Sequence, residues 1–254
     1  MALAEGRVDL FNALLGSVPW PEIGDNPLAY LSSIEEFKRY RLSLSEFFGV
    51  ATQHNNVRMM ARFRPLVSNI EILDYLADAA SRGHSRATKA ILEWTDRGDD
   101  DHVFMSVCEE ASLYAAENGH LGVVKLLNDE GALNAESAYY GIFNNRKSKT
   151  SEAKIRAIAH YLFHNSGFVI GSHYIIRYND PIIVQDFLSV YKGNLEPLCA
   201  DAAKNGYTSA LRVLLQQAYP AREDLTAACM KLAAAGGKTR TMQMLRDDFG
   251  AASR

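Results

Sequence analysis

The sequence contains little of what disulfide-bonded or membrane-spanning proteins need. Its 254 residues include only three cysteines, Cys108, Cys199 and Cys229, which lie far apart and form no CxxC pair. This odd, scattered set argues against a disulfide framework or a zinc cluster, so we expect three buried free thiols. No apolar run approaches the roughly 18 residues of a membrane span, and charged Glu5 and Arg7 interrupt the apolar N-terminal pattern that a signal peptide would need. We therefore expect a cytoplasmic protein without membrane insertion.

The chain also has little net charge, because acidic and basic residues are nearly balanced. The formal net charge is -3, and the basic residues are scattered along the chain, so nothing favours nucleic acid as a partner. Hydrophobic residues make up 48% and charged residues 22% of the chain, which are ordinary values for a folded protein. The composition predicts a folded protein that does not bind nucleic acid.

Recognisable catalytic motifs are missing. The chain contains no GxSxG elbow, kinase signature or dinucleotide-binding fingerprint. The Gly237-Lys238-Thr239 triplet resembles the end of a phosphate-binding loop, but Leu232 stands where that motif requires a glycine. We therefore expect no cofactor, and a protein that is not an enzyme.

Two histidines have a spacing that could suit metal ligands. His160 and His164 lie four residues apart on a predicted helix, so both could face one ion, with His173 as a third ligand. No acidic residue lies between the first two, as it does in HExxH. Ordinary surface or interlayer histidines are the favoured explanation of this spacing, and we predict no metal site.

What the sequence does contain is an internal repeat. In the clearest copy, residues 115–134, two alanines and two polar residues precede Gly119-His120 and an apolar stripe of Val123, Val124, Leu126 and Leu127. Glycine adopts positive φ without steric cost and so ends a helix, while the stripe has helical spacing. The pattern recurs in register around six other marker residues, two of them asparagine, which also tolerates the left-handed conformation: Gly6, Asn55, Gly83, Asn179, Gly206 and Gly237.

The markers recur with a period near 33 residues. The gap from 119 to 179 holds two copies, with helices predicted over 136–144 and 152–163 and a long loop over 144–151. The 49-residue gap from 6 to 55 implies an insertion, and residues 26–41 are typical of one extra helix. We predict one all-α domain over residues 1–254, built from seven to eight stacked helix pairs.

The sequence resembles the ankyrin-repeat family, which has this period. Residues 112–134 match it best and end in its turn, Gly131-Ala132-Leu133-Asn134. No copy has the family's Thr-Pro-Leu-His opening, which only Pro197-Leu198 approaches. The resemblance implies an ankyrin-like helical solenoid that binds a protein through its concave face, formed by the first helices and the loop tips. Divergent arrays of this kind resemble bacterial effectors and some viral proteins, which implies delivery into a host-cell cytosol.

The resemblance also implies which residues contact the partner. Most of them lie directly after or directly before the alanine pair of a repeat. Two tyrosines of the helix predicted over 136–144 and two basic residues of the loop over 144–151 complete the set. Tyrosine and arginine are enriched at binding hot spots, but packing between repeats would explain single tyrosines, and an ordinary solvated loop would explain the basic segment. The predicted partner-binding residues are Arg82, Tyr114, Glu117, Asn118, Tyr139, Tyr140, Arg146, Lys147, Tyr174, Arg177, Tyr178, Lys204 and Asn205.

The leading functional prediction is a protein-interaction module that is monomeric when unbound. A different class, an enzyme with a metal-assisted site in the irregular region 135–180, would use His160 and His164. A third possibility is oligomerisation or assembly of a membrane complex, because the first copy carries apolar Leu10, Phe11, Leu14 and Leu15 where a free solenoid would have a polar cap.

Overall fold

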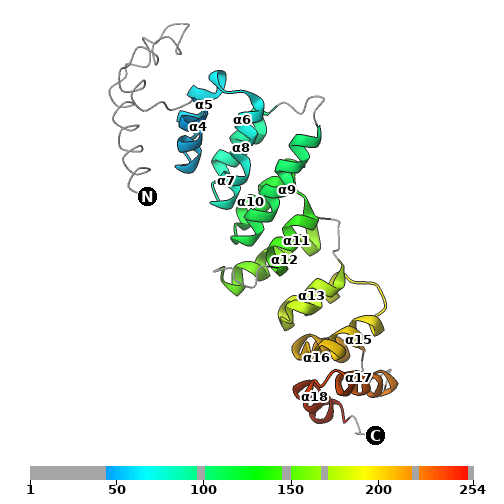
Figure 1. Ribbon diagram of the computed structural model, residues 1–254. Coiled ribbons are helices and arrows are strands. Elements are labelled where there is room, and N and C mark those ends of the chain that lie inside the picture. Colours follow the sequence, from blue (N-terminus) through cyan, green and yellow to red (C-terminus); the bar gives the residue numbers. More distant parts are fainter. Residues whose placement is uncertain (1–43, 96–100, 145–149, 167–170, 219–222, 251–254) are drawn as a thin grey trace, which may run out of the picture.

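The protein is helical throughout its described part. The computed structural model describes residues 44–95, 101–144, 150–166, 171–218 and 223–250, and over these ranges it contains helices and no strand (Figure 1). The predicted all-α class is thus confirmed. None of the helices in these ranges is long and apolar enough to cross a membrane. The Gly6 copy and the helix predicted over 26–41 lie outside the described residues.

The helices alternate between two sets. The first helices of successive pairs are α4 (Leu44–Gln53), α7 (Leu76–Ser81), α9 (Asp101–Glu117), α11 (Ala135–Asn144), α13 (Ser172–Tyr178), α15 (Glu196–Asn205) and α17 (Glu223–Ala235). The second helices are α5 (Val57–Phe63), α8 (Ser85–Trp94), α10 (Leu121–Asp129), α12 (Glu152–Asn165), α14 (Pro181–Val190), α16 (Thr208–Ala218) and α18 (Thr239–Phe249). A 3-10 turn, η2 (Arg64–Leu66), and α6 (Asn69–Leu73) join the first pair to the second.

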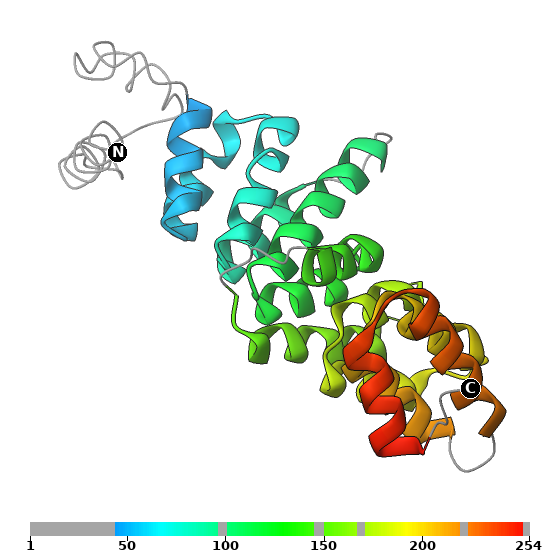
Figure 2. The same cartoon turned by 60° about the horizontal axis from the view of Figure 1, so that its bottom comes forward.

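These helices stack in two rows. Each first helix contacts the first helix of the next pair, from α4 and α7 through to α15 and α17, and we call this series the first-helix row. Each second helix likewise contacts the next, from α5 and α8 through to α16 and α18, and this series is the second-helix row. The pairs follow one another from the blue α4 to the red α18 (Figures 1 and 2). Each pair therefore packs mainly on its sequence neighbours.

The predicted turn residues reverse the chain inside the pairs. All of the markers within the described residues have positive φ, a conformation that costs a residue with a Cβ atom roughly 1–2 kcal/mol. Their φ values are 53° for Asn55, 74° for Gly83, 76° for Gly119, 62° for Asn179, 81° for Gly206 and 65° for Gly237. The predicted turns are confirmed.

The histidines that follow two of these glycines link neighbouring pairs. The ring of His84 donates from Nδ1 to the Thr52 carbonyl oxygen at 3.0 Å, and the ring of His120 donates from Nε2 to the Ser81 carbonyl oxygen at 2.9 Å. Burial lowers the pKa of His120, which favours the neutral ring. Each ring therefore satisfies a carbonyl at the end of the preceding first helix, which is a structural role.

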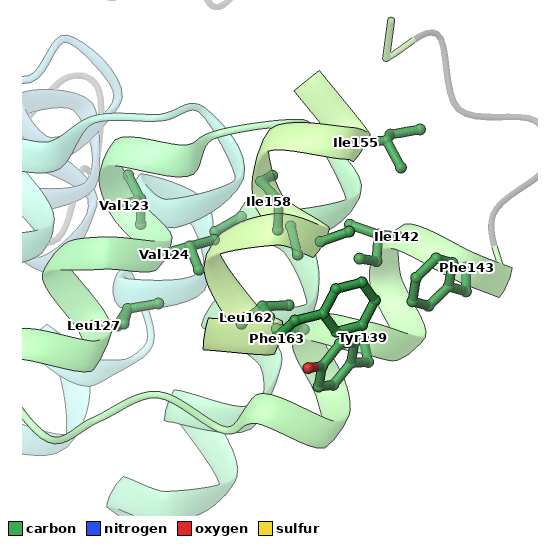
Figure 3. Packing of buried hydrophobic residues seen from close by; sticks show 14 of the residues in the cluster. Val123, Val124, Leu127, Tyr139, Ile142, Phe143, Ile155, Ile158, Leu162 and Phe163 are labelled. Carbon is green, nitrogen blue, oxygen red and sulfur yellow. The ribbon is translucent and has the colours of Figure 1, made fainter. Parts of the chain in front are cut away.

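A single hydrophobic core runs between the two rows. The predicted stripe of α10 places Val123, Val124 and Leu127 in it (Figure 3). The helices predicted over 136–144 and 152–163 are observed as α11 and α12 within one or two residues. All three cysteines are buried free thiols, as predicted.

Candidate functional site

The predicted partner-binding surface retains two exposed tyrosines on adjacent first helices. Tyr114 of α9 is 38% exposed and Tyr140 of α11 is 47% exposed. A Cβ atom on Gly141 would lie only 2.5 Å from the Leu113 carbonyl oxygen, so α9 and α11 approach very closely at this point. Because Tyr140 precedes Gly141 and Tyr114 follows Leu113, the two tyrosines lie on neighbouring turns of the two helices.

Tyr139 does not belong to this surface. Its side chain is fully buried, and its ring stacks on Phe163 at 5.8 Å and on Phe143 at 6.2 Å between ring centroids (Figure 3). Burial raises the pKa of Tyr139 to about 12. Consecutive helical residues point in directions about 100° apart, so only one of the two tyrosines can face outward. The prediction that Tyr139 lines the groove is corrected: Tyr140 is the outward residue.

Two further predicted tyrosines contribute to packing. Tyr174 and Tyr178 of α13 are half-buried against the core, and the Tyr178 ring meets Phe143 edge-on at 5.5 Å. Burial also raises the pKa of Tyr178. Their substitution would disturb the core as well as any surface, so they are poor probes of binding.

The polar members of the predicted set lie near the ends of first helices. Arg82 is exposed and pairs through Nε with Asp78 Oδ1 at 2.9 Å, while the Asn118 amide donates to the Tyr114 carbonyl oxygen at 2.9 Å. Glu117 is half-buried, and its carbonyl oxygen accepts from Thr150 Oγ1. The remaining described members are all exposed: Arg177, Lys204 and Asn205. Arg146 and Lys147 lie outside the described residues.

Two exposed apolar side chains of the first-helix row were not predicted. Val103 and Met105 of α9 are 40% and 49% exposed, and both precede Tyr114, the first predicted position of that helix. The predicted positions were placed relative to Ala115-Ala116, and these lie in the last turns of this 17-residue helix. The apolar pattern extends well before Ala115, and its length could have indicated a longer helix with further surface positions.

A groove of about 920 Å³ lies on the second-helix row, between α10, α12 and α14. Tyr161 and half-exposed Ile182 form apolar parts of its wall, and Lys125 places its ammonium 5.5 Å from the centre of the Tyr161 ring. Arg156 lines it as well, and its Nε donates to Asp180 Oδ2 at 2.9 Å. Asp180 in turn caps α14, accepting from the backbone N–H groups at the start of that helix.

Three potential metal ligands meet at this groove: His160 and Asp186 line it, and His164 lies beside them. His160 Nδ1 lies 3.0 Å from both carboxylate oxygens of Asp186, and His164 Nε2 lies 3.2 Å from Asp186 Oδ1. The two imidazole centroids are 4.5 Å apart. The ligand atoms of all three residues lie within 4.8 Å of one another, and a search of the described residues finds no other such group.

Sequence analysis found the two histidines but missed the carboxylate. It considered His173 as the third ligand, whereas that ring lies against Tyr174 at 4.1 Å between centroids and is not part of the group. Asp186 follows His160 by 26 residues, and the stacking of α12 on α14 brings them together. No local motif marks Asp186, because its place beside the histidines depends on this stacking.

Comparison of the chain with protein-family models, with curated proteins and with solved structures finds no match. The functional proposals for this chain accordingly rest on its own residues and their arrangement.

Proposed function

We propose that this protein is an ankyrin-type repeat array that binds another protein through its first-helix row. The observation that carries the proposal is the pair of exposed tyrosines, Tyr114 and Tyr140, on the closely packed helices α9 and α11. Tyrosine presents a large contact area with few rotatable bonds, which is why it is common at binding hot spots. The ankyrin assignment is supported by the two-row stacking, the left-handed markers and the Gly-His contacts between pairs.

The cysteines favour a reducing compartment for this interaction. Cys108, Cys199 and Cys229 are buried and form no disulfide, which is typical of cytosolic proteins. We extend the proposal to a monomeric array in a cytosol. The likeness to effector arrays extends the proposal to a partner protein in a host cell.

The test compares the full wild-type chain with a Tyr114→Ala/Tyr140→Ala double variant. Proteins captured by the wild type are identified, and the affinity of each purified candidate is measured for both forms. Loss of two central hot-spot tyrosines is expected to weaken binding at least tenfold.

The matched control is Ile182→Ala, which truncates a similarly exposed side chain on the second-helix row. It should bind with wild-type affinity, and circular dichroism should show that all three proteins remain helical. A partner that binds the double variant as tightly as the wild type would contradict a site at these tyrosines.

An enzyme whose site combines the histidines of region 135–180 with Asp186, just beyond it, is the second candidate. The observation that favours it is the groove at α12, where His160 and His164 meet Asp186 of α14. A metal-dependent hydrolytic activity towards model esters or phosphate esters, abolished in a His160→Ala/His164→Ala variant, would support it. Activity that survives this change would exclude these histidines as its basis.

A further inference from the structure

The groove on the second-helix row holds a set of donor atoms with no role in the proposed binding of a protein. His160 and His164 stand one turn apart on α12, and Asp186 reaches them from α14, the equivalent helix of the next pair. The three side chains thus join two successive repeats on the row opposite to Tyr114 and Tyr140.

We propose that His160, His164 and Asp186 bind one divalent zinc ion. Zinc takes imidazole nitrogen and carboxylate oxygen ligands at about 2.0–2.2 Å in tetrahedral geometry, so two ligand atoms of one site lie about 3.3 Å apart. The nitrogen–oxygen separations here are 3.0 Å for His160 and 3.2 Å for His164. All three ligand atoms lie within 4.8 Å of one another, so side-chain rotations of the two histidines can bring them to one ion.

The ligands are held on packed helices. On α12, Ile158 and Leu162 are fully buried on either side of His160, and on α14 Phe187, directly after Asp186, is fully buried. Core packing therefore fixes the backbone positions of the ligands, which favours a preorganised site. The bound ion would replace the ring protons that face the carboxylate and would cross-link α12 to α14.

The exposure of the site suits an ion with an open position. The His160 side chain is 66% exposed and that of His164 35%, whereas that of Asp186 is 22% exposed. Three protein ligands leave the fourth tetrahedral position to water, as in open zinc sites. The nearest cations of the groove are engaged elsewhere, since Arg156 pairs with Asp180 and Lys125 lies over Tyr161. The site is therefore accessible to an ion from solvent.

The test is a calorimetric titration of the full chain, free of affinity tag and of bound metal, with zinc chloride. The wild type should bind one equivalent of zinc, and its thermal unfolding midpoint should rise as zinc is added. Asp186→Asn, which keeps the size of the side chain but removes its charge, and His160→Ala/His164→Ala should each bind at least tenfold more weakly. Binding of cobalt in place of zinc should produce visible absorption in the wild type and none in these two variants.

The matched control is His173→Ala, which removes an exposed histidine outside the group. It should bind zinc as the wild type does. The histidine variants alter only exposed or partly exposed positions, and unchanged circular dichroism will show that they fold. The proposal is overturned if the wild type binds no zinc, or if Asp186→Asn and the double histidine variant keep wild-type affinity.

Discussion

Asparagine at the turn positions has two roles at once. Asn55 and Asn179 both have positive φ, and the side-chain oxygen of each accepts a hydrogen bond from the next pair. Asn55 Oδ1 accepts from the Ala87 N–H at 3.0 Å, and Asn179 Oδ1 from the Ala210 N–H at 2.9 Å. Both N–H groups belong to the first turn of a second helix, where the helix itself supplies no acceptor. Glycine would satisfy the backbone conformation but not this donor.

This pair of roles predicts a graded loss of stability at position 179. Asn179→Gly keeps the left-handed turn but removes the acceptor of the Ala210 N–H, which we expect to cost about 1 kcal/mol. Asn179→Ala removes the same acceptor and keeps a Cβ atom in the left-handed conformation without the short polar side chain that lets asparagine tolerate it, for about 1 kcal/mol more than the glycine variant. The free energy of unfolding measured in urea should therefore be highest for the wild type, lower for Asn179→Gly and lowest for Asn179→Ala.

The control for this series is Asn205→Ala. The Asn205 amide bonds only to Asp201 of its own helix among the contacts described, so its loss should cost less than 0.5 kcal/mol. Equal stability of Asn179→Gly and the wild type would show that the cap to Ala210 contributes nothing.

At the scale of elements, the contact between α9 and α11 depends on one residue without a side chain. At Gly141 an added Cβ would meet the Leu113 carbonyl oxygen at 2.5 Å and the Glu117 nitrogen at 3.1 Å, both atoms of the α9 backbone. A backbone cannot rotate away as a long side chain can. Gly141 thus sets the distance between these helices and with it the placement of Tyr114 and Tyr140.

We expect Gly141→Ala to destabilise the protein by about 1–3 kcal/mol, the usual cost of overpacking. Gly122→Ala is the matched control, because the same added atom on α10 would meet nothing closer than Ser85 Oγ at 3.6 Å. Alanine is the better helix former, so this control should leave the unfolding free energy unchanged or raise it by up to about 0.5 kcal/mol. Equal effects of the two substitutions would contradict a close contact at Gly141.

At the scale of the whole molecule, one apolar core extends through all seven described pairs. It contains ionisable side chains far apart along the chain, Tyr139 of α11 and Cys229 of α17, both fully buried. Burial raises the pKa of Tyr139 to about 12 and that of Cys229 to about 11. Both groups are therefore neutral in the folded protein at neutral pH, and charging either one opposes the fold.

Stability should consequently fall at alkaline pH. The Cys229 thiol has its ordinary pKa of 9.0 in the unfolded state and a raised pKa in the folded state, so the folded state binds this proton more tightly. Stability is therefore lost as pH rises from 9 through 11. At pH 10 the loss relative to pH 8 is about 1.4 kcal/mol from Cys229 and less than 1 kcal/mol from Tyr139.

Urea unfolding at pH 8 and pH 10 measures this loss. Cys229→Ala should reduce this loss by about 1.4 kcal/mol, and Tyr139→Phe, which keeps the stacked ring, should reduce it by less than 1 kcal/mol. A wild type that is equally stable at both pH values would show that these groups titrate normally in the folded protein.

The sequence by itself determined the local features of this protein. Alternation of apolar stripes with Gly119 and its counterparts predicted the helix pairs and their turns, because left-handed backbone and helical spacing depend on residues near one another in the chain. The buried cysteines followed from composition and spacing in the same way. These predictions required no knowledge of which helices pack together.

Tertiary structure decided which side chains reach the surface and which meet one another. The sequence does not distinguish the adjacent Tyr139 and Tyr140. The rotation of α11 against α9 and α12 buries Tyr139 and exposes Tyr140. Asp186 joins His160 and His164 only because α14 stacks on α12. Both outcomes depend on the relative rotation and distance of whole helices, which arise from packing summed over many residues and are not encoded by any short motif.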